Sequence, residues 1–308
     1  MSGPDKVPAH CAAYLAASMA TTLHSAQENV RVFLKEIRIE HTLFALPFAY
    51  VGAVFAGSPS LRQLLWITLA VIGARTAAMA ANRYFDREID ARNPRTARRA
   101  LASGKLSPAT MLWATLIGIV LLLVAAWQLN PLCVKLLPIA ALGVFVYPLC
   151  KRFTWLTHFV LGAVDALAPL GAFIGVAGTI TWPAVLLFGA VTVWVAGFDI
   201  AYALMDLPVD VEQGIRSLPA RFGERSGRVL LVVLHVAMIA MLALAGILAK
   251  TAWPYALGVF AAVALLLYED RLFDRSENVF VLNERIFTAN MTFSVLFLLT
   301  TVAGFALK

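Results

Sequence analysis

Charged side chains are scarce in this chain of 308 residues, because Asp, Glu, Lys and Arg together make up only 14% of it. A soluble domain keeps about a quarter of its residues charged, so this composition excludes an ordinary soluble protein. Cysteine is scarcer still, with three residues and no CxxC spacing, which excludes a disulfide framework and a cysteine-based zinc site. Apolar residues make up 61% of the chain, and the mean hydropathy is +0.80. The chain is therefore predicted to lie in a membrane.

The formal net charge is +7 and the pI is near 9.5. In a soluble protein this balance would suggest nucleic-acid binding, but here the basic residues fall in segments between apolar runs. The orientation of the chain in a lipid bilayer explains these positions better. Neither a nucleic acid nor an obligate protein partner is predicted.

Apolar runs of about the length needed to cross a bilayer recur along the chain. They predict an all-α membrane protein with about nine transmembrane helices. The predicted spans are 41–57, 63–82, 109–129, 132–150, 155–176, 183–206, 227–249, 252–269 and 286–307.

The segment before the first span is amphipathic. Residues 28–39 carry apolar side chains at the spacing i, i+3, i+4 and i+7, with basic side chains on the other face. This pattern predicts a helix that lies on the membrane surface. Residues 1–27 are predicted to be a loosely ordered N-terminal segment, without a convincing cleavage site. Residues 28–308 are predicted to form one domain.

Lys and Arg are distributed unevenly between the two sides of the membrane. The long connections at 83–108, 207–226 and 270–285 carry most of them. The positive-inside rule therefore places the N-terminus and these loops in the cytoplasm, and nine spans place the C-terminus outside the cell (inner) membrane. The other side carries almost only Arg62, Lys135, Lys250 and Lys308.

The second predicted span ends in a stripe of oxygen-bearing side chains. Asn82, Asp86 and Asp90 are spaced i, i+4 and i+8, so on a helix they share one face. Magnesium prefers oxygen ligands and commonly bridges a few carboxylates to a diphosphate. The stripe therefore predicts a Mg²⁺ site.

The sixth predicted span ends in a second stripe. Asp199, Tyr202, Asp206 and Asp210 again share a helical face, although Pro208 is expected to interrupt the helix before the last of them. Carboxylates at the ends of two parallel spans indicate function, because charge within a membrane is costly.

Basic residues at the same level are the expected partners of a phosphate group. A leaving diphosphate needs its developing charge neutralised by Mg²⁺ together with Lys or Arg. Lys151 is the strongest prediction, because it follows the fourth span directly. The other predicted phosphate-binding residues are Arg87, Arg95 and Arg216.

Two charged residues lie deeper in the predicted spans. Arg75 is seven residues before Asn82, about 10 Å away along the same helical face. One interpretation is that Arg75 binds the carboxylate of an aromatic acid. The other is that Arg75 pairs with Asp165 and holds the bundle together.

Three motifs together resemble the signatures of the UbiA-type intramembrane prenyltransferases, from about Val32 to the C-terminus. They are Asn82-x3-Asp86-x3-Asp90 with Asn93-Pro94-Arg95-Thr96, then Asp199-x2-Tyr202-x3-Asp206-x3-Asp210, and Tyr147-Pro148-x2-Lys151-Arg152.

The resemblance implies a helical bundle around a central cavity, with cap loops over a cytoplasmic mouth. It implies transfer of a polyprenyl group from a polyprenyl diphosphate to a hydroxylated aromatic acid in ubiquinone or menaquinone biosynthesis. Carried over residue by residue, the Mg²⁺ ligands are Asn82, Asp86, Asp90, Asp206 and Asp210. The catalytic set comprises these aspartates with Asp199 and Lys151, and Tyr202 joins the arginines in binding substrate.

The acceptor is less closely defined. Residues 38–48 and 73–79 differ from the pattern of the usual 4-hydroxybenzoate enzymes and look more like the related branch of futalosine-pathway menaquinone synthesis. The acceptor in that branch would be a dihydroxynaphthoate, which carries a carboxylate as 4-hydroxybenzoate does.

Two alternatives stay open. A secondary transporter also has intramembrane charges, but it binds substrate near the bilayer midplane, whereas both stripes here lie at one face. Prenylation of haem or chlorophyll is the alternative within the enzyme class, although no tetrapyrrole ligand is identifiable.

Overall fold

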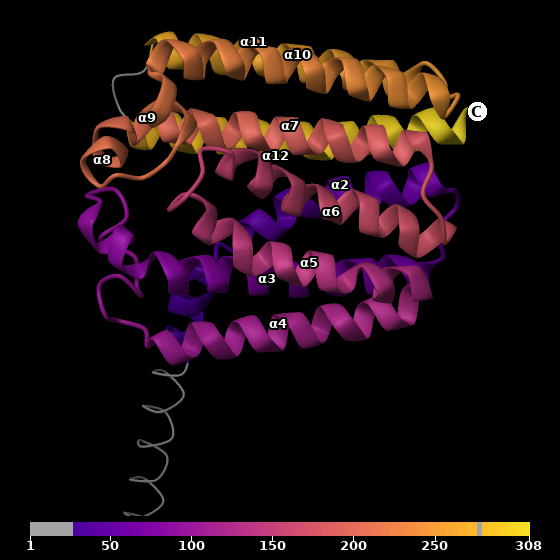
Figure 1. Ribbon diagram of the computed structural model, residues 1–308. Coiled ribbons are helices and arrows are strands. Elements are labelled where there is room, and N and C mark those ends of the chain that lie inside the picture. Colours follow the sequence, from indigo (N-terminus) through magenta and orange to yellow (C-terminus); the bar gives the residue numbers. More distant parts are fainter. Residues whose placement is uncertain (1–26, 276–278) are drawn as a thin grey trace, which may run out of the picture.

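The computed structural model describes residues 27–275 and 279–308, and within these residues every regular element is a helix (Figure 1). The predicted all-α architecture is confirmed. Apart from residue 27, the N-terminal segment 1–27 lies outside the described residues. The helices are α2 Glu40–Ala56, α3 Leu61–Arg92, α4 Pro108–Leu129, α5 Pro131–Cys150, α6 Thr157–Ala177, α7 Trp182–Met205, α8 Leu207–Glu212, α9 Leu218–Phe222, α10 Glu224–Leu248, α11 Pro254–Arg275 and α12 Val279–Ala306.

Seven helices in the described part of the chain are long and apolar enough to cross a bilayer, namely α3 to α7, α10 and α12. The other two predicted spans correspond to the shorter apolar segments Thr42–Ala56 and Pro254–Glu269, so the count of nine stays a prediction. Large apolar side chains cover the outer surface, as lipid contact requires; Ile117 and Phe260 are 64% and 69% exposed.

The predicted connection 83–108 is longer than the observed one. Helix α3 continues to Arg92, because its polar last turns keep their helical hydrogen bonds while apolarity ends near Asn82. The connection 207–226 contains the short helices α8 and α9, and α11 and α12 take up most of 270–285. The first carboxylate stripe is therefore entirely helical.

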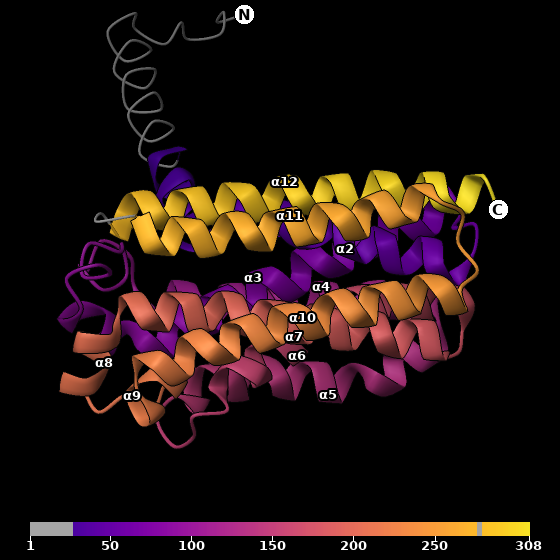
Figure 2. The ribbon, with the colours of Figure 1, turned by 90° about the horizontal axis from the view of Figure 1, so that it is seen from above.

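The long connections lie together at one end of the bundle. Figures 1 and 2 show α8 and α9 at the same end as the chain between α3 and α4, while the C-terminus lies at the opposite end. This arrangement agrees with the prediction that the connections 83–108 and 207–226 lie on the same side of the membrane. The site described below lies toward the end that carries α8 and α9.

Glycines bring helices of the bundle into close contact. A Cβ atom at Gly73 would lie 2.7 Å from the carbonyl oxygen of Gly118, and one at Gly118 would lie 2.6 Å from that of Gly73. Helices α3 and α4 therefore pack backbone to backbone, as small residues allow in membranes. This contact fixes α3, which carries the first stripe.

The amphipathic segment forms a helix over residues 27–36. Its Phe33 and the following Ile37 pack against the bundle beside Leu101 and Met111, whereas Val30 is 57% exposed. Part of the predicted membrane-facing stripe thus contacts protein, and the placement of this helix on the membrane surface stays a prediction.

Candidate active site

A cavity of about 400 Å³ lies among α2, α3, α5, α6, α7 and α12. Its polar wall carries cations, carboxylates and the amide of Asn82, and its other walls are largely apolar and aromatic. Six of the predicted site residues line it, namely Arg75, Asn82, Arg95, Lys151, Asp199 and Tyr202.

Asp86 of the first stripe lies directly behind this wall and is 2% exposed. Its Oδ2 accepts hydrogen bonds from Lys151 Nζ at 2.6 Å and from Asn82 Nδ2 at 2.7 Å. Lys151, predicted to bind phosphate, thus contacts the first stripe in the structure, and its role in binding phosphate stays a prediction. Lys151 lies between Asp86 and the cavity.

Asp90 has a similar environment one turn further along α3. It is 6% exposed, and its Oδ2 accepts a hydrogen bond from Arg99 Nη1 at 2.7 Å. The Thr96 hydroxyl bonds to the Asp90 carbonyl oxygen at 2.9 Å, which fixes the turn that brings Arg99 back over the stripe.

Asp206 of the second stripe pairs with Arg95, which follows the first stripe in the chain. Arg95 Nε donates to Asp206 Oδ1 at 2.8 Å, and Arg95 Nη2 donates to Oδ2. This bidentate pair joins the two stripes across the mouth of the cavity. Asn93 Oδ1 accepts from the Arg95 backbone N–H at 2.9 Å and so positions Arg95.

Asp210 lies on α8 and not on α7, as the interruption at Pro208 predicts. Asp210 and Arg216 line a separate surface pocket beside Phe153 and not the central cavity. Burial raises the pKa of Asp210 to about 6, although a hydrogen bond with Ser217 opposes the shift. A cation near Asp210 would therefore compete with a proton.

Arg216 and Arg87 do not reach the central cavity. The Arg216 backbone N–H donates to the Lys151 carbonyl oxygen at 2.8 Å, and its side chain donates to the Phe153 carbonyl oxygen. Arg216 thus supports Lys151 from outside. Arg87 lies over the Tyr84 ring and beside the exposed Glu88, away from the predicted phosphate position.

The oxygen atoms gathered here fit a hard divalent cation. Asp86 Oδ1 is buried and has no hydrogen-bond partner, so one lone pair of the stripe is available to a cation. In the described residues no three His, Cys, Asp or Glu side chains are close enough to hold a metal ion by themselves. The geometry therefore suits Mg²⁺ that takes further oxygen ligands from a bound substrate.

Arg75 pairs with Asp165, with Nη1 donating to Oδ1 at 2.6 Å. The interpretation in which Arg75 pairs with Asp165 to hold the bundle together requires this contact, and the contact is present. Arg75 Nε is buried without a hydrogen-bond partner, so the pair does not use all the donors of Arg75. The pair lines both the polar cavity and a neighbouring apolar cavity, and it marks the junction between them.

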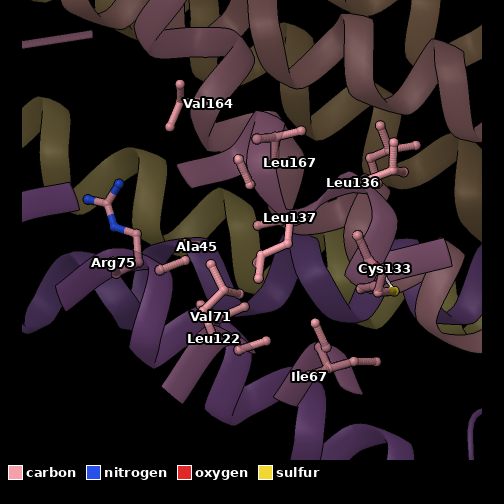
Figure 3. Close-up of a pocket in the computed structure, with 18 of the residues that line it drawn as sticks. Ala45, Ile67, Val71, Arg75, Leu122, Cys133, Leu136, Leu137, Val164 and Leu167 are labelled. Atoms are coloured by element: carbon pink, nitrogen blue, oxygen red, sulfur yellow. Dashed lines mark hydrogen bonds between the residues drawn. The ribbon is translucent and has the colours of Figure 1, made fainter. Parts of the chain in front are cut away.

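The apolar cavity lies among α3, α4, α5 and α6 and has a volume of about 150 Å³. Figure 3 shows aliphatic side chains such as Leu136 and Leu167 around it, with Arg75 at one edge. Small residues of α3 and α6 leave this space open. An apolar chain can enter such a cavity without leaving polar groups unpaired.

Asp199 lies on the cavity wall and has no Lys or Arg partner among the described residues. Its Oδ2 lies 2.7 Å from His158 Nδ1, and the Leu218 backbone N–H donates to His158 Nε2 at 3.1 Å. His158 is 2% exposed. His158 therefore does more than fill space, because both of its ring nitrogens take part in hydrogen bonds.

Several residues of this network were missed in the sequence. Arg99 was detectable, because it lies four residues after Arg95 and on the same short connection. Glu36 had no such signal, although its carboxylate accepts hydrogen bonds from the Ala100 and Leu101 backbone N–H groups at 2.7 and 3.3 Å. Buried Arg83 links Glu36 to the stripe, donating to the Glu36 carbonyl oxygen at 3.1 Å and to Asn82 Oδ1 at 3.0 Å.

The sequence of this chain is similar to a known protein family and to named proteins. Residues 45–290 match the UbiA prenyltransferase family. A 4-hydroxybenzoate octaprenyltransferase of Pseudomonas entomophila is 35% identical over 215 residues, which are 69% of this chain and 72% of that protein. Another of that name, from Citrobacter koseri, is 33% identical over 254 residues, or 80% of this chain and 86% of that protein.

Solved structures agree in fold. The apo structure of a UbiA homolog from Aeropyrum pernix K1 has a TM-score of 0.78 and 28% identity, covering 86% of this chain and 98% of that one. A UbiA homolog from Archaeoglobus fulgidus bound to GPP and Mg²⁺ has a TM-score of 0.70 and 19% identity, covering 89% and 99%.

The helical bundle, its apolar surface and its paired carboxylate stripes define an integral membrane protein with a polar chamber at one end. The chain belongs to the UbiA prenyltransferase family. The predicted resemblance is thereby confirmed, whereas the futalosine branch stays a prediction.

Proposed function

We propose that this protein transfers a polyprenyl group from a polyprenyl diphosphate to a hydroxylated aromatic acid in quinone biosynthesis. Two relatives of this chain are named 4-hydroxybenzoate octaprenyltransferases, and their names support this reaction. The Archaeoglobus homolog, which shares the fold, was solved with GPP and Mg²⁺ bound, and this also supports the reaction. The acceptor is 4-hydroxybenzoate or a dihydroxynaphthoate.

The observation that carries the proposal is the pairing of Lys151 with Asp86 and of Arg95 with Asp206 at the cavity wall. A diphosphate that enters the cavity offers both cations new partners, and this frees the two carboxylates. The freed carboxylates would hold Mg²⁺, which supplies positive charge to the leaving diphosphate when it is bound. The full ligand set would be Asn82, Asp86, Asp90, Asp206 and Asp210.

The chain's own residues then act on the charge that develops. As the C–O bond of the prenyl diphosphate breaks, its electron pair stays on the diphosphate, where Lys151 and Arg95 stabilise it. The allylic cation is left in a cavity lined by Phe44, Phe198 and Tyr202. Aromatic faces stabilise a nearby cation, and the Phe198 and Tyr202 rings pack edge to face with centroids 4.7 Å apart.

The acceptor ring carbon attacks the cation, and Asp199 accepts the proton that the acceptor loses. Arg75 is well situated for the acceptor carboxylate, because its Nε has no partner while Asp165 holds Nη1. The apolar cavity beside this pair suits the first isoprene units of the donor (Figure 3). The rest of a long tail leaves between helices into lipid.

The active-site end faces the cytoplasm in this proposal. Lys and Arg are concentrated in the connections at that end, as the positive-inside rule requires. The membrane is the cell (inner) membrane, and the C-terminus lies on its outer side. Reporter fusions at the connection of α8 and α9 and at the C-terminus test the orientation, and equal cytoplasmic signals at both would contradict it.

A prenyl-transfer assay read by mass spectrometry tests the reaction. Purified protein in lipid receives a short prenyl diphosphate with 4-hydroxybenzoate or a dihydroxynaphthoate, in magnesium or in EDTA. We expect a prenylated acid from one of the acceptors in magnesium and none in EDTA. Failure to bind the diphosphate at all would overturn the proposal in favour of a transporter. Binding without product would overturn the choice of acceptors.

A further inference from the structure

We propose that His158 is a positioning residue for prenyl transfer, which orients Asp199 toward the acceptor and ties it to the cap segment. The cap segment is residues 206–223, which contain α8 and α9. This inference rests on the proposed function, because it takes Asp199 as the proton acceptor.

His158 connects three parts of the chain. It is the second residue of α6, its Nδ1 lies 2.7 Å from Asp199 Oδ2 on α7, and its Nε2 receives the Leu218 backbone N–H of α9 at 3.1 Å. With 2% of its surface exposed, the ring is held by its packing as well as by these bonds. A displacement of α9 therefore displaces the imidazole that holds Asp199.

The hydrogen bonds fix the tautomer of His158. A backbone N–H can only donate, so Nε2 accepts and carries no proton, and the proton of the neutral ring is on Nδ1. Nδ1 then donates to Asp199 Oδ2. Among the described residues no group donates to Asp199 Oδ1, and this side chain lines the cavity. The arrangement holds one carboxylate oxygen and leaves the other toward the substrate.

The partner of Asp199 differs in charge from those of the other carboxylates. Asp86, Asp90 and Asp206 each pair with a Lys or Arg. A full positive charge stabilises the ionised carboxylate and opposes its protonation. Asp199 Oδ2 is held by the His158 ring instead, so the chain orients this carboxylate without a Lys or Arg ion pair.

The step that depends on this geometry is balanced as follows. The bond between the prenyl carbon and the diphosphate oxygen breaks, and the electron pair leaves with the diphosphate. A ring carbon of the acceptor forms the new bond to the prenyl carbon. The proton lost from the acceptor goes to Asp199 Oδ1 and then to solvent, so no oxidant or reductant is needed.

Two variants of His158 separate its role in orienting Asp199 from other roles of its imidazole ring. His158→Gln keeps one N–H donor and one carbonyl acceptor, so it can bond both Asp199 and Leu218. His158→Phe keeps a ring of similar size but has neither. Initial rates at varied acceptor and varied prenyl diphosphate give kcat and each KM, and magnesium-dependent diphosphate binding is measured separately.

We expect His158→Phe to lower kcat by about 100-fold, the lower range for losing a placed proton acceptor, with diphosphate binding unchanged. His158→Gln should stay within about fivefold of the unmodified protein, because both hydrogen bonds are kept. An unchanged kcat in His158→Phe would overturn the inference. Parallel loss of kcat and diphosphate binding would do so too, since it indicates a purely structural role. A Gln variant as slow as the Phe variant would overturn it as well, by assigning proton transfer to the imidazole itself.

Asp199→Asn keeps the inference testable if His158→Phe does not fold, as judged by thermal unfolding. The amide of this variant retains an oxygen for His158 but cannot take up a proton, so kcat should fall while diphosphate binding stays. Loss of diphosphate binding in this variant would overturn the assignment. If the unmodified protein transfers no prenyl group, the proposed function itself fails, and that result is distinct from both outcomes above.

Discussion

The two carboxylate stripes share a spacing of four residues, at 82, 86 and 90 and at 202, 206 and 210, but stand on different backbones. Asn82, Asp86 and Asp90 lie on α3, which is unbroken from Leu61 to Arg92. The second stripe is divided, since α7 ends at Met205 and Asp210 lies on α8. The first stripe is thus fixed by the bundle, whereas the position of the second depends on the cap segment. Equal spacing therefore does not imply equal rigidity.

The cation partners of the stripes are shared between the halves of the molecule. Arg95 follows the first stripe in the chain but pairs with Asp206 of the second, and Lys151 reaches Asp86 from the end of α5. Because Asp86 and Asp206 are each neutralised from another element, neither stripe is a complete site by itself. The two stripes are expected to respond together to a diphosphate.

Loss of one carboxylate from either stripe should have the largest effect. We expect Asp86→Asn and Asp206→Asn each to lower magnesium-dependent transfer by at least about 10³-fold, because charge stabilisation of the leaving group is lost. Initial rates by mass spectrometry measure this. Glu88→Gln is the matched control, since Glu88 is on the same helix with its side chain 73% exposed. Substantial residual activity in both Asp variants would remove this site assignment.

Weakening the ion pair between Arg95 and Asp206, which joins the two stripes, should have the next largest effect. Arg95→Lys keeps the positive charge but loses the bidentate contact with Asp206. Partners of metal-ligating side chains typically contribute 10- to 100-fold, and we expect a loss of about that size in the apparent affinity for Mg²⁺. A magnesium titration of the transfer rate measures it. An unchanged titration curve would show that the stripes work independently.

Much of the site was predictable because the motifs are local. Asn82, Asp86 and Asp90 are separated by whole helical turns, and Pro208 marks the end of α7 as its missing N–H requires. Seven of the predicted spans followed from apolar length alone. The length of helix α3 was underestimated because its last turns are polar, and hydropathy gives no signal for a polar helix.

The pairings were beyond the sequence, because they join residues far apart in the chain. Nothing in the spacing of Glu36 or His158 predicts that each receives a backbone N–H from a connection many residues later. In the sequence, a lone His near a span end cannot be distinguished from a packing residue. Only the structure shows that α9 donates a hydrogen bond to this one. The contact of Arg75 with Asp165 was one of two interpretations, and only the fold shows that they meet.

The deeper pair on the α3 face should give an intermediate effect. Arg75→Met and Asp165→Leu each leave a largely buried charge unpaired, which should destabilise the protein by about 3–5 kcal/mol. The double variant should recover most of this stability in thermal unfolding. We expect its KM for the acceptor to stay raised, because the acceptor carboxylate has lost Arg75. Full recovery of activity in the double variant would show that Arg75 and Asp165 have only a structural role and that Arg75 does not bind the acceptor.

Removing the break in the second stripe should have a small effect. Pro208→Ala restores a backbone N–H and lets α7 continue toward α8, which makes the two stripes alike. We expect the magnesium requirement to rise by less than about tenfold, since only Asp210 among the predicted oxygen ligands is displaced. Magnesium titration with Pro219→Ala as the control tests this. A loss as large as that of Asp206→Asn would mean that the break itself is essential.

The smallest effect should come from Arg87, which the sequence placed with Lys151 as a phosphate-binding residue. Arg87 lies over Tyr84, 4.9 Å from the ring centroid, and it does not line the cavity. An exposed ion pair such as that with Glu88 contributes at most about 1 kcal/mol. We therefore expect Arg87→Gln to leave kcat and the diphosphate KM nearly unchanged, whereas Lys151→Gln impairs both. If Arg87→Gln impaired kcat and the diphosphate KM as much as Lys151→Gln does, Arg87 would bind the diphosphate too. The first stripe would then bind phosphate on both of its sides.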